Sequence, residues 1–448
     1  MNSSLDTSTL AQLLTGKVIT PDDPAYEDAR KTLFNKESKP AVVVECASVE
    51  DVVATTKFAE ENNLAISVRS GGHSGAGLSS NNGGLVIDLK LMSSVEIIDE
   101  QAHTVRIGGG AKWLAIAKEL ATHNLAISSG DTTTVGVGGL TLGGGMGWMV
   151  RGHGLTIDNL VAAEIVTADG KVLRLSEQEN PELFWAIRGG GGGFGVVTSF
   201  EIRAYPNKGI FGGLIAYPVE KRETILRNWA SYMRTAPEEL NSTIMLFPGF
   251  GPGATPQVML LVCYAGDDET AAQKAIQPLR ELGDTPVIDE VKAKPYYGML
   301  EEAMDVSAMK VRVRNGFVKS FDDELIATLS EHFGIPGSPP IQIRSLGGAF
   351  GRISDDATAF GHRSSEALMI MPSFTPANAT EDEANAAADK LWAPLKKFST
   401  GAYVNFITDI RPETVNDAYS AATRARLAKI KAEYDPKNIF SHAAVPTE

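Results

Sequence analysis

The chain has 448 residues, of which 43% are hydrophobic and 21% are charged, and its formal net charge is −14. A chain of this length exceeds the usual size of a single hydrophobic core, so two domains are expected. The negative charge argues against nucleic acid or an anionic membrane surface as a partner, because both require clustered lysine and arginine.

Residues 1–17 lack the basic flank and apolar run of a signal peptide, and no segment reaches the roughly 18 apolar residues of a membrane helix. We therefore expect no membrane partner and a cytoplasmic location. Cys46 and Cys263 lie in apolar segments and are interpreted as core residues rather than as a disulfide or metal pair. No HxH or HExxH spacing occurs, so no metal site is expected.

The N-terminal half alternates predicted strands with helices. Ser48, followed by Asp51, resembles a capping box that opens a helix. Residues 159–176 contain two β-rich runs joined by Asp169 and Gly170, which indicates a hairpin. Further strands are expected over 39–48, 64–70, 83–89 and 95–107, and helices over 49–62 and 111–124.

Glycine gathers in three segments of this half. Residues 69–77 read RSGGHSGAG, ten of the 25 residues from Gly130 to Gly154 are glycine, and so are six of the seven from Gly189 to Gly195. Without a Cβ atom, glycine leaves backbone N–H groups unshielded, as close approach of a diphosphate and a flat ring requires. Each cluster alone could equally serve tight turns, and none fits the strand, GxGxxG and helix order of a Rossmann fingerprint.

Beyond Pro206 the glycine clusters end, which we interpret as a domain boundary. Strand-like runs at 212–219, 243–250 and 257–265 alternate with helix-like segments such as 268–283. Residues 412–434 carry apolar side chains at helical spacing and predict one further helix.

Many of these segments, in the same order, resemble the FAD-linked oxidases of the vanillyl-alcohol-oxidase type, specifically the berberine-bridge-enzyme-like group. The matching segments are VRSGGHSGAG, GGLVIDLKLM, VGVGGLTLGGGMGW, GLTIDNL, VTADGKVL, NPELFWAIRGGGGGFGVVTSFE, LGGAFG, AYVNFITD and YDPKNIF. The resemblance implies an α+β, two-domain PCMH-type FAD-binding fold with an antiparallel-sheet substrate domain. The expected boundaries are 1–205 for the FAD-binding domain, 206–409 for the substrate-binding domain, and 410–448 for a segment returning to the FAD domain.

The resemblance also implies how the cofactor is held. In that family the histidine of the GGH turn is joined covalently to the 8α methyl group of the flavin, and it corresponds to His73. Many members add a second link through a cysteine, whose place here is taken by Thr132, so we expect FAD with a single covalent link through His73. The other expected FAD-binding residues are Arg69, Ser70, Gly71, Gly72, Ser74, Gly77, Thr134, Val135, Gly136, Gly138, Gly139, Gly143, Gly147, Asn159, Val197 and Asn405.

On the substrate side, the resemblance points to residues 341–351 and 402–409. If IQIRSLG is a strand, Gln342, Arg344 and Leu346 share one face. Arg344 would there either bind a substrate carboxylate or pair with an internal acid. Amine-oxidising members of the group carry Lys, Glu and Glu at comparable positions, so the three residues argue against amine oxidation.

Tyr403 is the candidate catalytic base, with Gln342 and Arg344 as the other candidate catalytic residues. A phenol would need a neighbouring cation to bring its pKa down from about 10, and Arg344 is the candidate cation. Alternatively, Tyr403 packs on the flavin and Asn405 only hydrogen-bonds it.

The sequence thus predicts an FAD-dependent oxidase whose partners are a small-molecule substrate and dioxygen. The expected reaction transfers a hydride from a small alcohol, hemiacetal or secondary metabolite to the flavin, and dioxygen is reduced to hydrogen peroxide. The alternatives are an amine oxidase, an oxygenating flavoprotein, a dehydrogenase with another acceptor, or a flavin-containing binding protein without turnover. The residues point to no particular oligomeric state.

Overall fold

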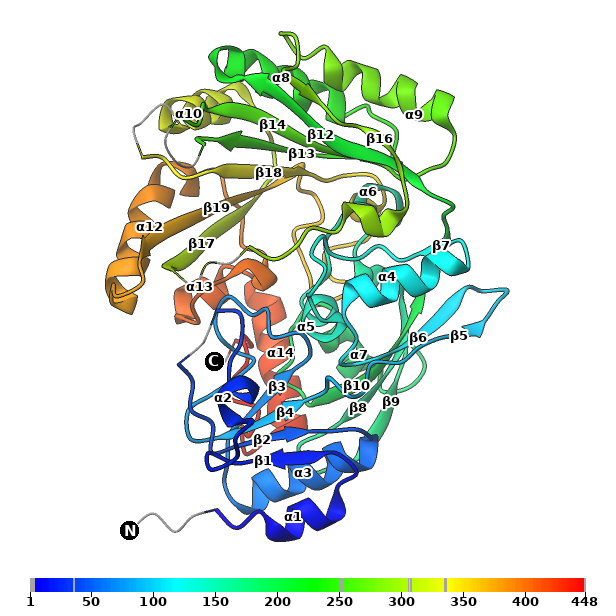
Figure 1. The fold of residues 1–448 in the computed structure, drawn as a ribbon, viewed down its shortest axis with the longest axis vertical. Coiled ribbons are helices and arrows are strands. Elements are labelled where there is room, and N and C mark those ends of the chain that lie inside the picture. The colour runs from blue at the N-terminus through cyan, green and yellow to red at the C-terminus, as the bar shows by residue number, and fades with distance from the viewer. Residues whose placement is uncertain are drawn as a thin grey trace.

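The computed structural model describes residues 5–34, 37–249, 253–304, 306, 308–333 and 337–446. It has an α+β fold, as predicted, in which a large antiparallel sheet lies above two smaller sheets (Figure 1). None of the helices in these ranges is long and apolar enough to cross a membrane.

The first sheet lies in the N-terminal part and has the strand order β1-β2-β4-β3. Strands β2, β3 and β4 run parallel, and β1 is antiparallel to β2. Ser48 caps the following helix by accepting a hydrogen bond from the Asp51 amide. The elements are α1 (Ser8–Leu13), β1 (Lys17–Ile19), α2 (Tyr26–Ala29), β2 (Val42–Glu45), α3 (Val49–Glu61), β3 (Ile66–Arg69) and β4 (Leu85–Asp88).

The second sheet is antiparallel and has the order β5-β6-β10-β8-β9. Its hairpin between β8 and β9 confirms the prediction from Asp169 and Gly170, and Gly170 adopts the positive φ that such a turn requires. A short pair, β7 with β11, adjoins it. The elements are β5 (Val95–Asp99), β6 (Thr104–Gly108), α4 (Trp113–Thr122), β7 (Leu125–Ala126), α5 (Val137–Leu142), α6 (Val150–His153), η1 (Thr156–Asn159), β8 (Leu160–Val166), β9 (Val172–Leu175), α7 (Pro181–Ile187), β10 (Val196–Arg203) and β11 (Tyr205–Pro206).

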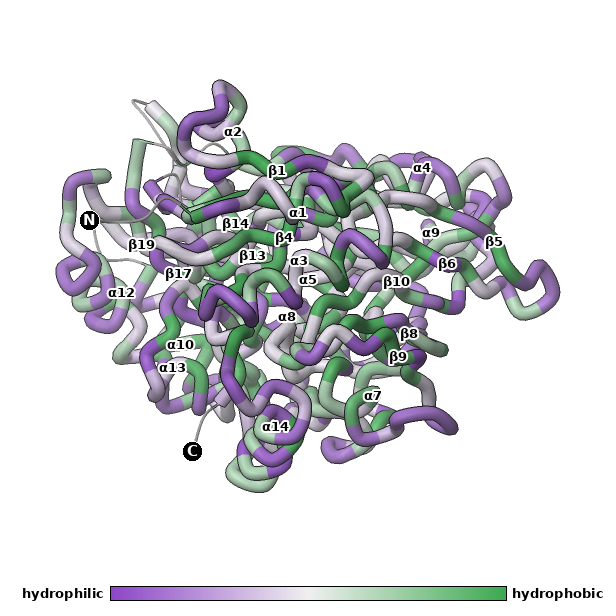
Figure 2. Tube along the Cα trace, turned by 90° about the horizontal axis from the view of Figure 1, so that it is seen from below, coloured by the Kyte–Doolittle hydropathy of each residue, from purple (hydrophilic) through white to green (hydrophobic). Residues whose placement is uncertain are grey.

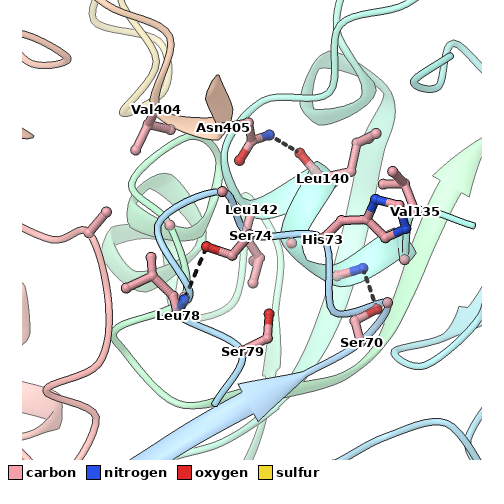
Figure 3. A pocket seen from close by; sticks show the side chains of 18 of the residues that line it. Ser70, His73, Ser74, Leu78, Ser79, Val135, Leu140, Leu142, Val404 and Asn405 are labelled. Atoms are coloured by element: carbon pink, nitrogen blue, oxygen red, sulfur yellow. Dashed lines mark hydrogen bonds between the residues drawn. The ribbon is translucent and has the colours of Figure 1, made fainter. Parts of the chain in front are cut away.

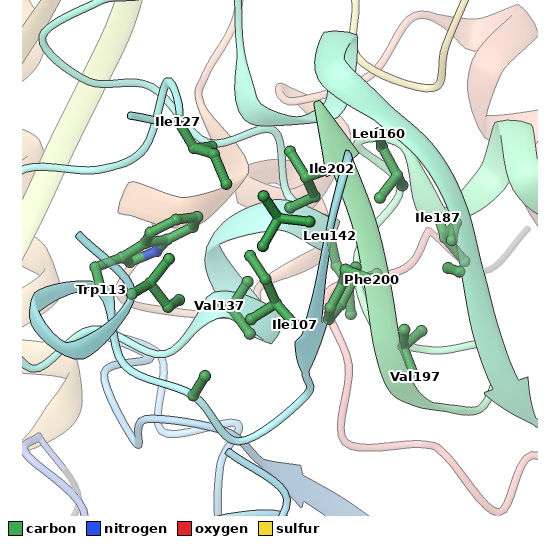
Figure 4. Packing of buried hydrophobic residues seen from close by; sticks show 14 of the residues in the cluster. Ile107, Trp113, Ile127, Val137, Leu142, Leu160, Ile187, Val197, Phe200 and Ile202 are labelled. Atoms are coloured by element: carbon green, nitrogen blue, oxygen red, sulfur yellow. The ribbon is translucent and has the colours of Figure 1, made fainter. Parts of the chain in front are cut away.

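Helices α4 and α5 pack on this second sheet through apolar side chains. Trp113 from α4, Val137 from α5 and Phe200 from β10 meet in one buried cluster (Figure 4). Cys263 belongs to the same cluster, whereas Cys46 packs in a separate one beside the first sheet, so both cysteines are core residues as predicted. Burial on this scale is the main favourable contribution to folding.

The large sheet has the order β15-β12-β14-β13-β18-β19-β17, with β16 pairing to β12. Apolar residues of α8, α9, α10 and α12 pack on it in a second cluster. The elements are β12 (Ile210–Pro218), η2 (Val219–Lys221), α8 (Arg222–Met233), β13 (Leu240–Phe247), β14 (Gln257–Tyr264), α9 (Glu269–Ile276), η3 (Gln277–Arg280), β15 (Ile288–Asp289), β16 (Lys292–Lys294), η4 (Tyr296–Met299), β17 (Met309–Val318), α10 (Asp323–Phe333), β18 (Ile341–Ser345), α11 (Ala349–Arg352), β19 (Ala367–Pro376) and α12 (Glu381–Lys396).

The C-terminal segment differs from the single helix predicted over 412–434. After η5 (Val404–Phe406) it forms two helices, α13 (Pro412–Asn416) and α14 (Ala421–Tyr434). The second helix starts at its own cap, because the Ser420 side chain accepts a hydrogen bond from the Thr423 amide. Helix α14 then packs against α7 of the second sheet's layer.

Separate packing centres therefore underlie the lower and upper parts of the molecule. In a view from below, hydrophobic segments occupy interior strands such as β8, whereas α12 at the edge carries many hydrophilic residues (Figure 2). On this basis we propose the units 1–205 and 206–409, with 410–448 packed against the first.

Arg151 joins these two parts of the molecule. Its guanidinium group donates hydrogen bonds to the carbonyl oxygens of Ala236 and Leu240, at 2.9 Å each, and of Leu346, at 2.7 Å. Arg151 lies on α6, and its acceptors lie at the ends of α8, β13 and β18, so one buried side chain, 5% exposed, fixes the large sheet to the lower layer.

Replacing Arg151 with methionine should lower the melting temperature by several degrees. The substitution keeps an apolar stem but leaves three buried carbonyl oxygens without a donor, and each unsatisfied group costs about 1–3 kcal/mol. Arg352→Gln is the matched control, because Arg352 forms an exposed ion pair with Glu238 that contributes little. Thermal unfolding followed by circular dichroism measures both variants, and equal melting temperatures would contradict the role of Arg151.

Candidate functional site

A cavity of about 380 Å³ lies where the lower layers meet the large sheet. Its walls come mainly from the loop after β3, the segment leading into α5, the glycine run before β10, the η5 segment, and residues 440–444. Figure 3 shows His73, Val135 and Asn405 pointing into the space that these segments enclose. Residues far apart in the sequence therefore build one pocket.

The cavity depends on a direct contact between two backbones. A Cβ atom on Gly71 would lie 2.2 Å from the amide nitrogen of Gly136, and one on Gly136 would lie 2.3 Å from that of Gly71. Both distances are far below van der Waals contact, so only glycine allows the two loops to meet. Ser70 adds hydrogen bonds across the contact, accepting from the Gly138 amide and donating to the Gly109 carbonyl oxygen.

The loop after β3 presents unpaired backbone donors to this cavity. Within the described residues, the N–H groups of residues 71–75 donate no hydrogen bond to the protein. Because unpaired amides are costly to bury, a row of them in residues that line a cavity indicates a site for an anionic ligand such as a diphosphate.

His73 stands in the same loop and faces the cavity. Its Nε2 atom lies 2.8 Å from the Thr134 hydroxyl. Burial, together with the charge of Lys112, lowers the pKa of His73 below its ordinary value. The imidazole is thus neutral at physiological pH, and a ring nitrogen retains the lone pair needed for bonding to an electrophile.

The glycine run before β10 is fixed from the C-terminal side. The Lys431 ammonium group donates to the carbonyl oxygens of Gly193, at 2.7 Å, and Phe440, at 3.2 Å, and pairs with Asp435 at 2.5 Å. The motif YDPKNIF therefore closes the cavity by tying the last residues of the chain to the glycine run.

Tyr403 is buried at the wall that faces the loop of His73. Its hydroxyl oxygen accepts hydrogen bonds from the Gly145 amide at 2.9 Å and from Asn405 Nδ2 at 3.0 Å. Burial raises the pKa of Tyr403, and this effect outweighs the hydrogen bonds and the charge of Arg344, which act in the opposite direction. The pKa of Tyr403 thus shifts in the direction opposite to the one that a base at this position would need, which favours a protonated phenol.

Arg344 pairs with an acid, one of the two roles considered for it. Its Nη2 atom lies 2.5 Å from Oδ2 of Asp131, and its guanidinium group also contacts Gln342. Gln342 and Arg344 share one side of β18 as predicted, but the strand ends at Ser345. Leu346 directly follows the strand, its amide still donates to the Glu366 carbonyl oxygen, and its side chain is buried in a cluster that includes Tyr403.

The predicted site residues divide into two groups. Those that line the cavity are Ser70, Gly71, Gly72, His73, Ser74, Val135, Gly136, Gly138, Gly139, Val197, Tyr403 and Asn405. Those that lie outside its lining are Arg69, Gly77, Thr134, Gly143, Gly147, Asn159, Gln342 and Arg344.

Several residues of the second group support the cavity from behind. Arg69 forms a buried ion pair with Asp88 at 2.9 Å, and Asn159 bonds the Tyr205 hydroxyl. Gly143 leaves room for Asn405, because a Cβ atom there would lie 2.1 Å from the amide oxygen.

The sequence analysis missed several lining residues. Asp131, Met146, Val313, Phe406 and His442 all face the cavity. Asp131 directly precedes Thr132, which was singled out, so examining the neighbours of that position would have found it. Met146 and Phe406 lie inside the quoted motifs VGVGGLTLGGGMGW and AYVNFITD, whereas no local pattern points to Val313 and His442.

Comparison with known proteins identifies related domains and structures. Residues 40–176 match the FAD binding domain family, and residues 402–444 match the family described as berberine and berberine like. The chain is 31% identical to (R)-6-hydroxynicotine oxidase of Paenarthrobacter nicotinovorans, over 99% of this chain and 98% of the relative.

Two solved structures show the same fold over nearly the whole chain. The structure of 6-hydroxy-D-nicotine oxidase from Arthrobacter nicotinovorans has a TM-score of 0.85 and 28% identity, and covers 99% of both chains. That of glucooligosaccharide oxidase from Acremonium strictum, whose FAD is 6-S-cysteinyl and 8α-N1-histidyl, has a TM-score of 0.83 and 25% identity, and covers 98% of both chains. The fold is therefore of the PCMH type, as predicted.

Replacing Gly71 with alanine should destabilise the protein, because the added methyl group would overlap the backbone of Gly136. Overpacking of this kind costs about 1–3 kcal/mol. Gly152→Ala is the control, since a Cβ atom there meets nothing closer than 3.5 Å. Thermal unfolding of both variants tests this, and a Gly71→Ala protein as stable as the Gly152→Ala protein would disprove the close contact.

Proposed function

Because the chain belongs to the berberine-bridge-enzyme-like family of FAD-dependent oxidoreductases, we propose that it is an oxidase for small alcohols. In this proposal the substrate is a small alcohol, hemiacetal or secondary metabolite that gives up a hydride, and dioxygen is reduced to hydrogen peroxide. The observation that carries it is the cavity in which unpaired amides, a neutral histidine and a buried tyrosine face one space. The alternative of a flavin-binding protein without turnover is set aside, because the relatives are named oxidases and FAD-linked oxidoreductases.

The residues of the cavity fit FAD. The free N–H groups of residues 71–75 match the negative charge of a diphosphate, and the contact of Gly71 with Gly136 holds this loop in place, because a side chain at either position would push the two backbones apart. His73 would hold the flavin through one covalent bond, as the corresponding histidine does in the family. When bound, FAD supplies the acceptor for the hydride and passes the electrons on to dioxygen.

Thr132 supports a single covalent link. Glucooligosaccharide oxidase is described with both a cysteinyl and a histidyl bond to its flavin. In this chain Thr132 lines the cavity. The sequence resemblance assigns Thr132 to the position of that cysteine, and an alcohol side chain does not form the thioether. Only His73 therefore remains to form the link.

Tyr403 and Asp131 are the two polar residues to which we assign roles on the substrate side of the cavity. Burial keeps Tyr403 neutral, so we assign it to hydrogen-bond donation: its oxygen accepts two protein hydrogen bonds, and its own proton has no acceptor among the described residues. The Asp131 carboxylate lies on the cavity wall, held by Arg344. We assign to it the acceptance of the hydroxyl proton while the adjacent C–H bond loses its hydride. Such a base contributes roughly 10²–10⁴ to the rate.

Amine oxidation is the second candidate. The relative that is 31% identical is named for the oxidation of 6-hydroxynicotine. Gln342, Arg344 and Leu346 stand at the positions where Lys, Glu and Glu are expected for an amine site, and for this reason we favour an alcohol.

Replacing His73 with alanine should abolish covalent attachment of the flavin. After acid precipitation, yellow colour and flavin fluorescence should stay in the wild-type pellet but appear in the supernatant of the His73→Ala protein. Thr132→Ala is the control and should keep its flavin in the pellet. Flavin released from the wild-type protein would refute the covalent link.

Anaerobic mixing with a panel of small alcohols should bleach the flavin absorbance of the wild-type protein, and admission of air should restore it with one peroxide per turnover. Asp131→Asn should slow the bleaching roughly 10²–10⁴-fold, because the carboxylate that accepts the proton is lost. Stopped-flow absorbance measures both steps. Bleaching confined to secondary amines would overturn the assignment to alcohols, and slow recovery in air would indicate a dehydrogenase.

A further inference from the structure

The substrate side of the cavity carries very little charge. Among the described residues that line it, Asp131 is the only Asp, Glu, Lys or Arg. Its side chain is 25% exposed, and its Oδ2 atom lies 2.5 Å from Nη2 of Arg344. An ionised group at such a wall dominates the recognition of any ligand that enters, because the surroundings screen charge weakly.

Arg344 lies one side chain behind this wall. Its own side chain is 12% exposed, and its guanidinium carbon lies 5.2 Å from the centre of the Phe406 ring, which lines the cavity. Gln342 contacts the same guanidinium group at 3.3 Å. The arginine is therefore near enough to serve a ligand, but Asp131 and Phe406 stand between it and the cavity.

The backbones of Asp131 and Arg344 are both hydrogen-bonded to neighbouring segments. Strand β18 pairs with β13 and β19 on either side, so the backbone of Arg344 lies inside the large sheet. The loop of Asp131 is fixed to residue 301, because the Glu301 amide donates to the Asp131 carbonyl oxygen and the Thr133 amide donates to the Glu301 carbonyl oxygen. Both partners of the salt bridge therefore stand on backbones that are hydrogen-bonded to neighbouring segments.

Two other acidic groups face this region. The exposed Glu301 interacts electrostatically with both Asp131 and Arg344, and Glu302 accepts a hydrogen bond from the Thr133 hydroxyl. Both oppose an incoming anion. No Lys or Arg is among the described residues that line the cavity, and the nearby charge of Lys112 acts on His73 from outside the lining.

We propose that the Asp131–Arg344 pair acts as a charge filter on the substrate side of the cavity: Asp131 masks the arginine, so this side accepts uncharged hydrogen-bond donors and excludes carboxylates. This inference rests on the proposed function, since it names the substrate class of the same site. The neutral pair leaves the Asp131 carboxylate as an acceptor for a substrate hydroxyl. For an anionic ligand, in contrast, the Arg344 guanidinium group is already paired with Asp131.

Three planar probes of one size test the filter: benzoate, benzamide and benzamidine, which are anionic, neutral and cationic. Each is titrated into the oxidised holoenzyme, and the change in flavin absorbance gives its dissociation constant. The wild-type protein should bind benzoate at least about tenfold more weakly than benzamide, because a hydrogen bond to a charged group is the interaction that benzoate lacks there.

Asp131→Ala should reverse this order by strengthening benzoate binding at least about tenfold, since the ligand carboxylate takes the place of the removed one and pairs with Arg344. Asp131→Asn is the matched control: it removes the charge but fills the space, so it should show no such gain. The double variant Asp131→Ala, Arg344→Gln should lose the gain again. If Asp131→Ala binds benzoate no better than the wild type, or if the double variant keeps the gain, the proposal is overturned.

Arg344→Gln provides a second test that does not depend on the Asp131 variants. It leaves the carboxylate unpaired, so benzamidine should bind at least about tenfold more tightly than to the wild type. An unchanged benzamidine affinity would overturn the masking role of the pair. None of these titrations needs turnover, so they can succeed where no alcohol is oxidised, and they can fail in an active alcohol oxidase.

Discussion

The contact between Gly71 and Gly136 is the constraint on which the rest of the site depends. Two loops from different layers approach until backbone touches backbone, and residues 71–75, whose amides have no acceptor among the described residues, line the cavity beside this contact. A side chain at either position would separate the loops and displace His73 from Thr134. The glycines thus serve less as flexible hinges than as residues that allow a rigid, close contact.

The cavity needs the large sheet as much as it needs these loops. Arg151 ties β13 and β18 to the layer below through three carbonyl oxygens, and Tyr403 reaches the backbone of Gly145 from the opposite side. Both interactions pair a side chain with a main-chain group of a distant segment. The orientation of the substrate wall over the cofactor region therefore depends on a few buried hydrogen bonds, whose loss would be costly in a low-dielectric interior.

The charge states of the residues at the cavity follow from the same packing of the large sheet against the lower layers. Arg344 points toward the cavity from a central strand, and a bare guanidinium group there would be expensive to bury. Asp131 neutralises it and at the same time becomes the polar feature of the wall. Burial also acts on Tyr403 and His73, keeping the first protonated and the second neutral. One cavity thus combines a protonated phenol, a neutral imidazole and a paired carboxylate.

The sequence by itself determined the features that depend on neighbouring residues. The hairpin at Asp169 and Gly170, the cap at Ser48, the strands around the glycine turn and the family membership all follow from local patterns or from ordered motifs. The sequence also predicted that Gln342 and Arg344 lie on one side of β18, but it did not predict that the strand ends before Leu346. Only the tertiary structure decided which distant groups meet. These groups include the Asp131–Arg344 pair, the buried Tyr403, whose ionisation is opposed by its surroundings, and the hydrogen bonds of Arg151. All three depend on how the sheets pack, and side-chain periodicity within one strand carries no information about that packing.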